Sequence, residues 1–360
     1  MEAKWLAGPN RSKTRFGESS LFKEGLYQLT RNAYAWMVPN GSWGETNIGL
    51  VDCGGQSLLV DTFWDLHYIG EFLEYASIIL TDSPVEKIVN THSDGDHCWG
   101  NQLFKDKEII ASQACAKQMH QHTPSAMQAF KQGGKLLRHI PVGQVDKLGR
   151  YMSTMFSPYQ FDNVIITDPA TCFEGSHEFN LNGVDIVVTE VGPGHTDGDA
   201  IVYIPSQDVA YAGDILFIGV TPVMWSGPLD NLLQGIEKLR SLNPKVVVPG
   251  HGPLADAHSI QAVIDYWHFA HEQLHARFQQ DKEPHEAALE VLQSRDFAQS
   301  VFAKWDSPER MVTNAYTLYR HWGASVSRLP EKLGVMDLFR RQAQVAFKLP
   351  HATPACMHRR

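Results

Sequence analysis

The strongest constraint on the fold of this chain is a repeated pattern in which an apolar, strand-like run ends directly in His and Asp residues. The pattern occurs at VEKIVNTHSDGDH (85–97), VDIVVTEVGPGHTDGD (184–199), VAYAGD (209–214) and KVVVPGHG (245–252). Short runs of β-branched and apolar residues that stop at Gly, Pro or Asp are typical of buried strands. These strand ends are therefore expected to deliver polar side chains to one shared rim, with Asp214 and His251 each at a strand terminus.

The remaining patterns place this rim in a mixed α/β domain. The elements predicted up to residue 256 are strands within 26–65, at 85–92, 108–112, 178–191, 201–205, 209–214 and 245–252, and helices at 66–80 and within 113–140. After Asp256 the patterns are helical only, at 259–279, 284–293, 309–322 and 336–347. Because a single core stops growing near about 250–300 residues, we expect a catalytic domain at 1–256 and a helical extension at 257–360.

Composition excludes several classes of partner. The net charge is -9 and the Lys and Arg residues are scattered, so nucleic acid is a poor candidate and a small molecule is the expected substrate. The chain has no run of about 18 apolar residues, which argues against membrane insertion. The first residues lack the apolar stretch of a secretory signal, so a cytoplasmic location is expected.

The helical extension is expected to pack on the main domain. The alternatives are that it forms a binding module, a cover over the site or a contact in a homodimer.

The segment HSDGDH carries four possible metal ligands in six residues: His92, Asp94, Asp96 and His97. If the segment is extended, alternate residues share a side, so the first three would converge while His97 faces a second position. Imidazole and carboxylate at this density suit zinc, iron or manganese.

The ordered motifs resemble the metallo-β-lactamase superfamily. Its signature HxHxDH is matched here by His92, Asp96 and His97, with Asp94 in place of the usual second His. The other matching motifs are NIGLVD (47–52), LLVDT (58–62), GPGHT (192–196), AGD (212–214) and PGHG (249–252). The resemblance covers about residues 26–256. It implies an αββα sandwich with the site between the edges of two sheets.

The resemblance also implies a ligand set. His92, Asp94 and His195 would hold a first metal ion; Asp96, His97 and His251 would hold a second; and Asp214 would bridge them. Two divalent ions lower the pKa of a shared water toward about 7 and polarise a carbonyl oxygen. Asp96 would act as the catalytic residue that orients the resulting hydroxide, and Asp61 would fix a ligand by hydrogen bonding.

Asp94 is where the chain departs from the family pattern. A carboxylate in place of an imidazole adds negative charge and favours harder cations, so zinc is the first expectation and iron or manganese are alternatives. Di-iron proteins that resemble this family carry a carboxylate here, but the chain shows no flavodoxin-like domain that would supply electrons.

Three hypotheses about function follow. The first is a dinuclear hydrolase that acts on an ester, thioester, lactone or amide-like bond. The second is a non-haem di-iron oxidoreductase, and the third is a binding or regulatory protein that has kept the fold.

Several other residues are expected to be structural. The five cysteines form no CxxC pair and are expected to be reduced thiols, with Cys98 a buried apolar residue. His268, His271 and His275 share one helical face and are expected to be ordinary surface or core histidines rather than metal ligands. Trp99 is expected in the core, whereas Met224 and Trp225 fit a pocket rim as well as a core.

Overall fold

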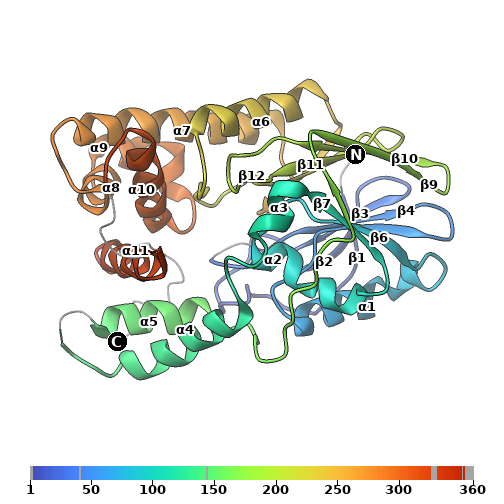
Figure 1. Cartoon of the computed structure of the whole chain (residues 1–360), viewed down its shortest axis with the longest axis horizontal. Helices are drawn as coiled ribbons and strands as arrows, with labels where there is room; N and C mark the ends of the chain where they lie inside the picture. Colours follow the sequence, from blue (N-terminus) through green and yellow to red (C-terminus); the bar gives the residue numbers. More distant parts are fainter. Residues whose placement is uncertain (1–2, 40–41, 143–144, 326–330, 351, 353–360) are drawn as a thin grey trace.

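The computed structural model describes residues 3–39, 42–142, 145–325, 331–350 and 352. Its two β-sheets pack against each other with helices on both outer sides (Figure 1). The first sheet has eight strands in the sequential order β1 to β8, and the second has five in the order β13-β12-β11-β10-β9. This arrangement confirms the predicted α/β class and αββα sandwich, with further helices toward the C-terminus.

The strands are β1 (Lys4–Ala7), β2 (Gly25–Gln28), β3 (Ala33–Met37), β4 (Ile48–Asp52), β5 (Ser57–Val60), β6 (Val85–Val89), β7 (Glu108–Ser112), β8 (Thr171–Phe173), β9 (Ser176–Leu181), β10 (Val184–Glu190), β11 (Ala200–Ile204), β12 (Val209–Phe217) and β13 (Val246–His251). The α-helices are α1 (Leu66–Leu80), α2 (Gly95–Cys98), α3 (Gln113–Gln118), α4 (Pro124–Leu137), α5 (Val145–Met155), α6 (Leu229–Ser241), α7 (Ala257–Phe278), α8 (Pro284–Leu292), α9 (Arg295–Gln299), α10 (Met311–His321) and α11 (Glu331–Ala346). The 3₁₀ helices are η1 (Trp99–Phe104), η2 (Val301–Lys304) and η3 (Pro308–Arg310).

Strand alternation explains the layers. In β3, Tyr34 and Trp36 join the hydrophobic cluster that includes Phe72 of α1, whereas Ala35 and Met37 join the cluster between the two sheets. Successive side chains of a strand point to opposite faces, so a strand that is apolar at every position serves two cores at once. This is why the burial of β3 is continuous.

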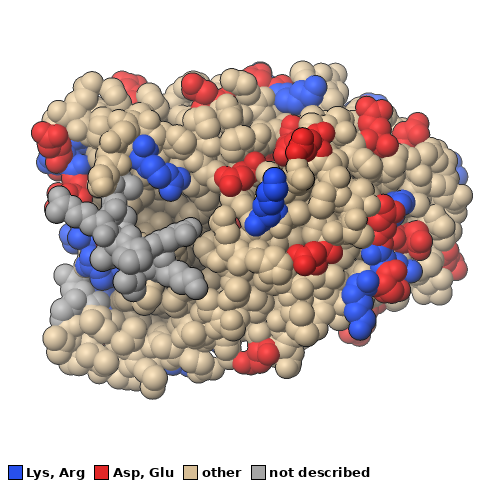
Figure 2. All heavy atoms as spheres, in the orientation of Figure 1, with Lys and Arg blue, Asp and Glu red and all other residues tan. Residues whose placement is uncertain are grey.

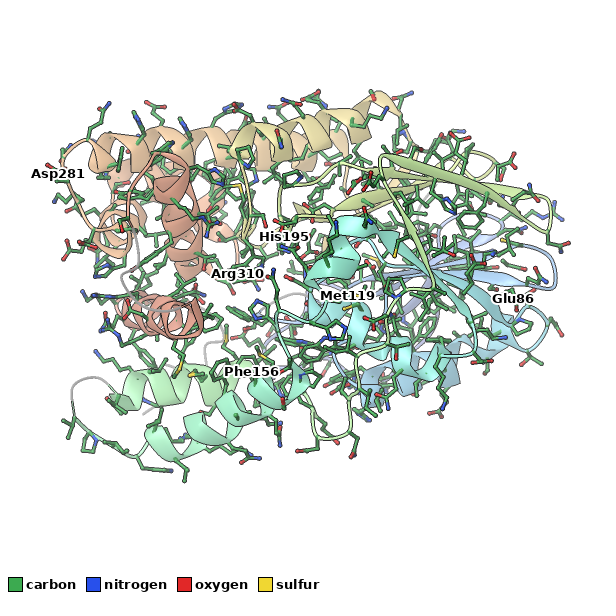
Figure 3. The ribbon with its side chains drawn as sticks, in the orientation of Figure 1. Glu86, Met119, Phe156, His195, Asp281 and Arg310 are labelled. Atoms are coloured by element: carbon green, nitrogen blue, oxygen red, sulfur yellow. The ribbon has the colours of Figure 1, made fainter. Side chains whose placement is uncertain are left out.

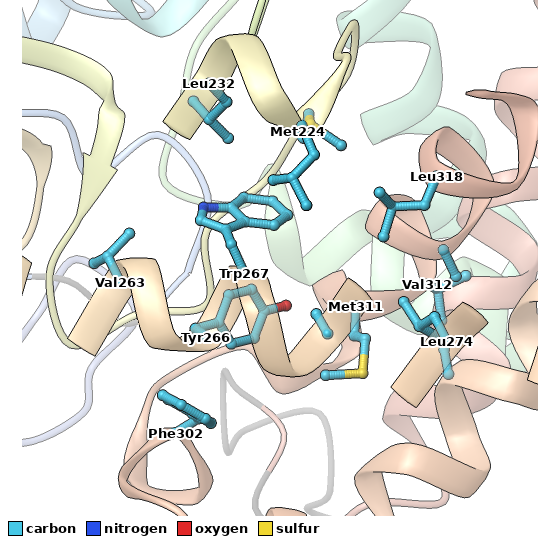
Figure 4. Packing of buried hydrophobic residues seen from close by; sticks show 14 of the residues in the cluster. Met224, Leu232, Val263, Tyr266, Trp267, Leu274, Phe302, Met311, Val312 and Leu318 are labelled. Atoms are coloured by element: carbon cyan, nitrogen blue, oxygen red, sulfur yellow. The ribbon is translucent and has the colours of Figure 1, made fainter. Parts of the chain in front are cut away.

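A third cluster lies on the outer face of the second sheet. It contains Ala210 and Ile215 of β12 together with Trp267 of α7 and Leu318 of α10, and Figure 4 shows Trp267 surrounded by apolar side chains from several helices. The C-terminal helices therefore pack on the second sheet. The division into domains at residue 256 stays a prediction.

The helices α5 and α6 were not predicted, nor were the short strands β1 and β8. Glycine weakens a helical pattern in sequence, and α5 carries Gly149 at its centre. In the structure, a Cβ at Gly149 would lie 2.2 Å from the Arg138 nitrogen, and one at Gly134 of α4 would lie 2.7 Å from the Ser153 nitrogen. Both glycines are required because the two helices approach each other so closely.

Charged side chains of both signs are interspersed over the face shown in Figure 2. Within the described residues, no helix combines the length and the apolar character needed to cross a membrane.

Replacing Trp267 tests the packing of the C-terminal helices. Trp267 is fully buried in the third cluster, so Trp267→Ala should lower the free energy of unfolding by about 3–5 kcal/mol. Leu136→Ala is the control, because Leu136 is 73% exposed and its loss should cost less than about 0.5 kcal/mol. Urea unfolding of the two variants and the wild type measures both values. Equal effects would contradict the packing described here.

Candidate metal centre

The seven side chains predicted as metal ligands meet at one place in the structure. His92, Asp94 and His195 form one group, and Asp96, His97 and His251 form another, with the ligand atoms of each group within 4.8 Å of one another. We call these groups cluster one and cluster two. Their assignment as metal ligands stays a prediction, while the two clusters and the fold are consistent with a divalent metal site.

Asp214 lies between the two clusters. Its Oδ2 is 3.7 Å from Nε2 of His92, 3.3 Å from Nε2 of His195 and 3.2 Å from Nε2 of His251. Its Oδ1 is 3.2 Å from Nε2 of His97. One buried carboxylate is therefore surrounded by the same nitrogen of four imidazoles.

The other ring nitrogen of each imidazole is held from outside the centre. The Nδ1 contacts are His195 to the Val223 carbonyl at 2.7 Å, His251 to the Glu45 carbonyl at 2.9 Å, His97 to Asp61 Oδ2 at 3.0 Å and His92 to Thr91 Oγ1 at 2.9 Å. Carbonyl and carboxylate oxygens only accept hydrogen bonds. The Thr91 hydroxyl donates its own hydrogen to Asp61, so it accepts from His92. Each Nδ1 therefore carries a hydrogen, and whenever the imidazole is neutral its Nε2 presents a lone pair toward the centre.

This donor set fits divalent metal ions. Four inward lone pairs and the carboxylate of Asp214 repel one another unless a cation lies between them. In addition, Nε2 of the buried His92 has no hydrogen-bond partner among the described residues. Imidazoles that bind a metal commonly donate their other N–H to a carbonyl or carboxylate. The outward contacts of these imidazoles follow that pattern.

Without a cation, protons would take its place. Burial alone would lower the pKa of His195, but the carboxylates of Asp214 and Asp94 raise it to about 9. Burial alone would raise the pKa of Asp214, but His251 and His97 hold it well below its usual range. Metal binding must therefore displace protons, and apparent metal affinity should rise with pH.

The segment that carries His92, Asp94 and Asp96 is not extended, so the prediction that these three converge on one side was wrong. Gly95–Cys98 forms the short helix α2, with Asp94 at its N-cap. Consecutive residues of a helix point about 100° apart. Asp96 consequently joins His97 and His251 rather than His92.

Asp214 also differs from its predicted position, because it lies inside β12 and not at its end. The pairing of β12 with β13 shifts register on both sides of Gly213, which has a φ of +55°. A Cβ at Gly213 would lie 2.6 Å from Thr91 Oγ1. The glycine thus lets β12 pass close to the segment that carries His92, and His251 ends β13 as predicted.

Sequence reasoning missed the residues that hold the carboxylates. Thr46 Oγ1 donates to Asp96 Oδ2 at 2.8 Å, and the indole Nε1 of Trp225 donates to Asp94 Oδ2 at 3.1 Å. Asp61 was predicted, and its Oδ1 accepts from the Thr91 nitrogen at 2.7 Å. Thr46 was not singled out, and Trp225 was expected only at a pocket rim or in the core. Both lie in turn-rich segments without a ligand motif, so only their positions in space reveal these hydrogen bonds.

The cysteines, Trp99 and three further histidines were predicted to be structural. Cys98 is buried and Trp99 belongs to a hydrophobic cluster, as predicted. Cys53, Cys115 and Cys172 are free like Cys98, and Cys356 lies outside the described residues. His268, His271 and His275 are absent from the candidate metal groups of the described chain.

A cavity of about 580 Å³ opens onto the two clusters. Asp94, Asp96 and Asp214 line it, as do His195 and Arg310, which are labelled in Figure 3. Its other walls are mostly aromatic or apolar and include Trp43, Trp64, Trp99, Phe217, Trp225, Tyr316, Leu338 and Phe339. Trp225 is therefore a rim residue, whereas Met224 is fully buried in the third cluster.

Residues 41–251 match the family model described as the metallo-β-lactamase superfamily. The chain belongs to the metallo-β-lactamase superfamily. All seven predicted ligand positions of this superfamily member fall within the matched region.

Similar proteins extend the comparison. Beta-lactamase-like protein 2 homolog of Caenorhabditis elegans is 23% identical over 213 residues, which are 59% of this chain and 57% of that relative. The stereoselective inverting sec-alkylsulfatase Pisa1 from a Pseudomonas species has a TM-score of 0.62 at 15% identity, covering 85% of this chain and 52% of its own. A metallo-β-lactamase family protein from Thermus thermophilus has a TM-score of 0.55 at 21% identity, covering 82% and 96%. These structures support the superfamily fold.

Removing one imidazole of cluster two should remove its metal ion. His97→Ala or His251→Ala deletes one of three ligand side chains, and each variant should hold about one metal ion per chain instead of two, because bulk water does not replace an imidazole without loss of affinity. Elemental analysis after dialysis gives the metal content. His258→Ala is the control, since His258 is exposed. Wild-type metal content in either cluster variant would contradict the assignment.

Proposed function

We propose that this chain is a dinuclear metallohydrolase that cleaves an ester, thioester, lactone or amide-like bond of a small molecule. The observation that carries the proposal is the pair of clusters joined by Asp214, in which four imidazoles turn the same nitrogen toward one carboxylate. The superfamily match and the sulfatase among the structural neighbours support hydrolysis.

His92, Asp94 and His195 would hold one divalent ion, and Asp96, His97 and His251 the other, with Asp214 between them. When bound, such ions acidify a water to serve as the nucleophile and polarise the oxygen of the bond under attack. Zinc is the first choice, and the carboxylate of Asp94 also suits iron or manganese.

Asp96 is the proposed catalytic residue. It lines the cavity, and the Thr46 hydroxyl fixes one of its oxygens at 2.8 Å. A carboxylate held in one orientation can accept a hydrogen bond from the attacking water and keep it aimed at the substrate. The apolar walls suit a substrate with an apolar body, because binding pockets combine mostly apolar lining with a few polar groups.

The alternative is a non-haem di-iron oxidoreductase. The observation that favours it is Asp94, which lies in cluster one with Oδ2 at 3.2 Å from Nε2 of His195 and adds a carboxylate that iron accepts well. The third hypothesis, a binding protein, is disfavoured because every predicted ligand position holds a side chain that can bind metal.

Activity in the absence of oxygen separates these functions. The wild type, stripped of metal and reloaded with zinc, manganese or iron, should hydrolyse members of a panel of nitrophenyl esters, thioesters and lactones equally well with and without oxygen. Asp96→Asn should lower kcat by about 100-fold or more while the protein still binds metal. Iron-dependent oxygen uptake without hydrolysis would favour the alternative. Failure to turn over any compound with any of the three metals would leave the binding hypothesis.

Asp94 should set metal preference. Asp94→His should shift the metal content toward zinc without abolishing binding, because imidazole suits zinc whereas carboxylate widens the choice. Asp94→Ala should instead lower the occupancy of cluster one. Cells grown with equal zinc, iron and manganese, followed by elemental analysis of the purified proteins, provide the comparison. The same metal content in all three proteins would show that Asp94 is not a ligand.

A further inference from the structure

Residues 222–226 form a segment that lies between cluster one and helix α10. We call it the 222–226 segment. On one side it contacts both Asp94 and His195, and on the other it is hydrogen-bonded to side chains of α10. It therefore joins the C-terminal helices to one half of the candidate metal centre.

On the side of the metal centre, the segment holds two of the three residues of cluster one. The Trp225 indole N–H donates to Asp94 Oδ2 at 3.1 Å. The Val223 carbonyl accepts from Nδ1 of His195 at 2.7 Å, and the Trp225 backbone nitrogen donates to the His195 carbonyl at 2.8 Å. The positions of Asp94 and His195 thus depend on where this segment lies.

On the opposite side, α10 fixes the segment at several points. The buried Asn314 accepts from the Met224 nitrogen at 3.0 Å and donates to the Pro222 carbonyl at 2.9 Å. The exposed Arg320 donates to the Trp225 carbonyl at 2.6 Å. These bonds leave the segment little freedom to move while α10 stays in place.

Cluster two has a different support. Asp96 accepts from Thr46, and Nδ1 of His251 donates to the Glu45 carbonyl. The 222–226 segment makes neither contact. A disturbance of this segment should therefore act on cluster one and spare cluster two.

The chemistry of Trp225 also matches Asp94 in particular. An indole N–H is only a donor, and a carboxylate can accept from it while facing a metal. An imidazole that gives one nitrogen to a metal carries a hydrogen on the other and offers no acceptor to the indole. The departure from the family pattern at residue 94 and the indole of Trp225 thus form a pair.

We propose that Trp225 is a positioning residue for Asp94, and that helix α10, through the 222–226 segment, sets the metal affinity of cluster one alone. The inference rests on the metal centre of the proposed function. It assigns to the C-terminal helices a role in metal binding beyond packing and covering the cavity.

The direct variant is Trp225→Phe, which keeps an aromatic ring and removes the donor. Arg320→Met removes a donor from an exposed position, and Arg320→Lys restores one, so this pair tests α10 even if residue 225 tolerates no change. Thr46→Val is the matched variant for cluster two. Zinc is titrated into each metal-free protein in competition with a chromogenic chelator. The dissociation constant that rises in Asp94→Ala is assigned to cluster one.

Trp225→Phe should lower the affinity of cluster one for its ion by about 10-fold, which is the lower end of the usual effect of removing a hydrogen-bond partner of a metal ligand. The affinity of cluster two should stay unchanged. Thr46→Val should do the opposite. Arg320→Met should weaken the ion of cluster one, and Arg320→Lys should recover most of the loss. In an Asp94→His background, Trp225→Phe should no longer weaken binding, because the imidazole has no acceptor to lose.

Unchanged zinc dissociation constants in both Trp225→Phe and Arg320→Met would overturn the inference, as would an equal loss of affinity at both clusters. These affinity measurements do not depend on whether the protein hydrolyses its substrate, so they separate a failure of the inference from a failure of the proposed hydrolysis. Wild-type protein that binds two ions but hydrolyses nothing would refute the hydrolase and leave the role of α10 standing, whereas normal hydrolysis with unchanged affinities would do the reverse.

Discussion

The central constraint on this structure is the burial of Asp214 among four imidazoles, each with its Nε2 within 3.7 Å of the carboxylate. A buried charge is costly unless a group of opposite charge or a hydrogen-bond donor pairs with it. The segments that carry the histidines must therefore keep fixed positions relative to β12. The sandwich provides these positions. The β6 and β10 ends, the interior of β12 and the end of β13 all reach the same edge, and Gly213 lets two of these segments come close enough.

The supporting contacts divide the centre into two halves. Glu45 and Thr46 hold cluster two from the loop between β3 and β4, while Val223 and Trp225 hold cluster one from the loop after β12. Asp61 serves both halves, because it binds Nδ1 of His97 directly and His92 through Thr91. The orientation of each imidazole is thus set by groups that contact its Nδ1 and lie outside clusters one and two.

Much of the fold could be predicted from the sequence, because hydrophobic periodicity is a local property. Helix α1 spans the predicted residues 66–80. Strand β13 ends at His251 as predicted, while His92 and His195 follow the ends of β6 and β10 by a few residues. Helix α5 could not be recognised, since Gly149 looks like a helix-weakening residue until the close approach of α4 is known. The bond between Trp225 and Asp94 spans 131 residues, and no local pattern encodes a contact between such distant positions.

The same division between local pattern and tertiary contact applies to the cavity. The side of the cavity at the two clusters comes from motifs that a single sequence displays, such as those with Asp94 and Asp96. Tyr316 and Phe339 reach the cavity from helices α10 and α11. The ligand motifs constrain the metal chemistry but leave the shape of the opposite wall free to vary. Residues outside the ligand motifs can therefore change the shape of the cavity while the motifs stay the same. Because side chains of α10 also hydrogen-bond to the 222–226 segment here, we expect a change in the C-terminal helices to alter the candidate metal centre as well as the cavity, which would couple the two properties in this chain.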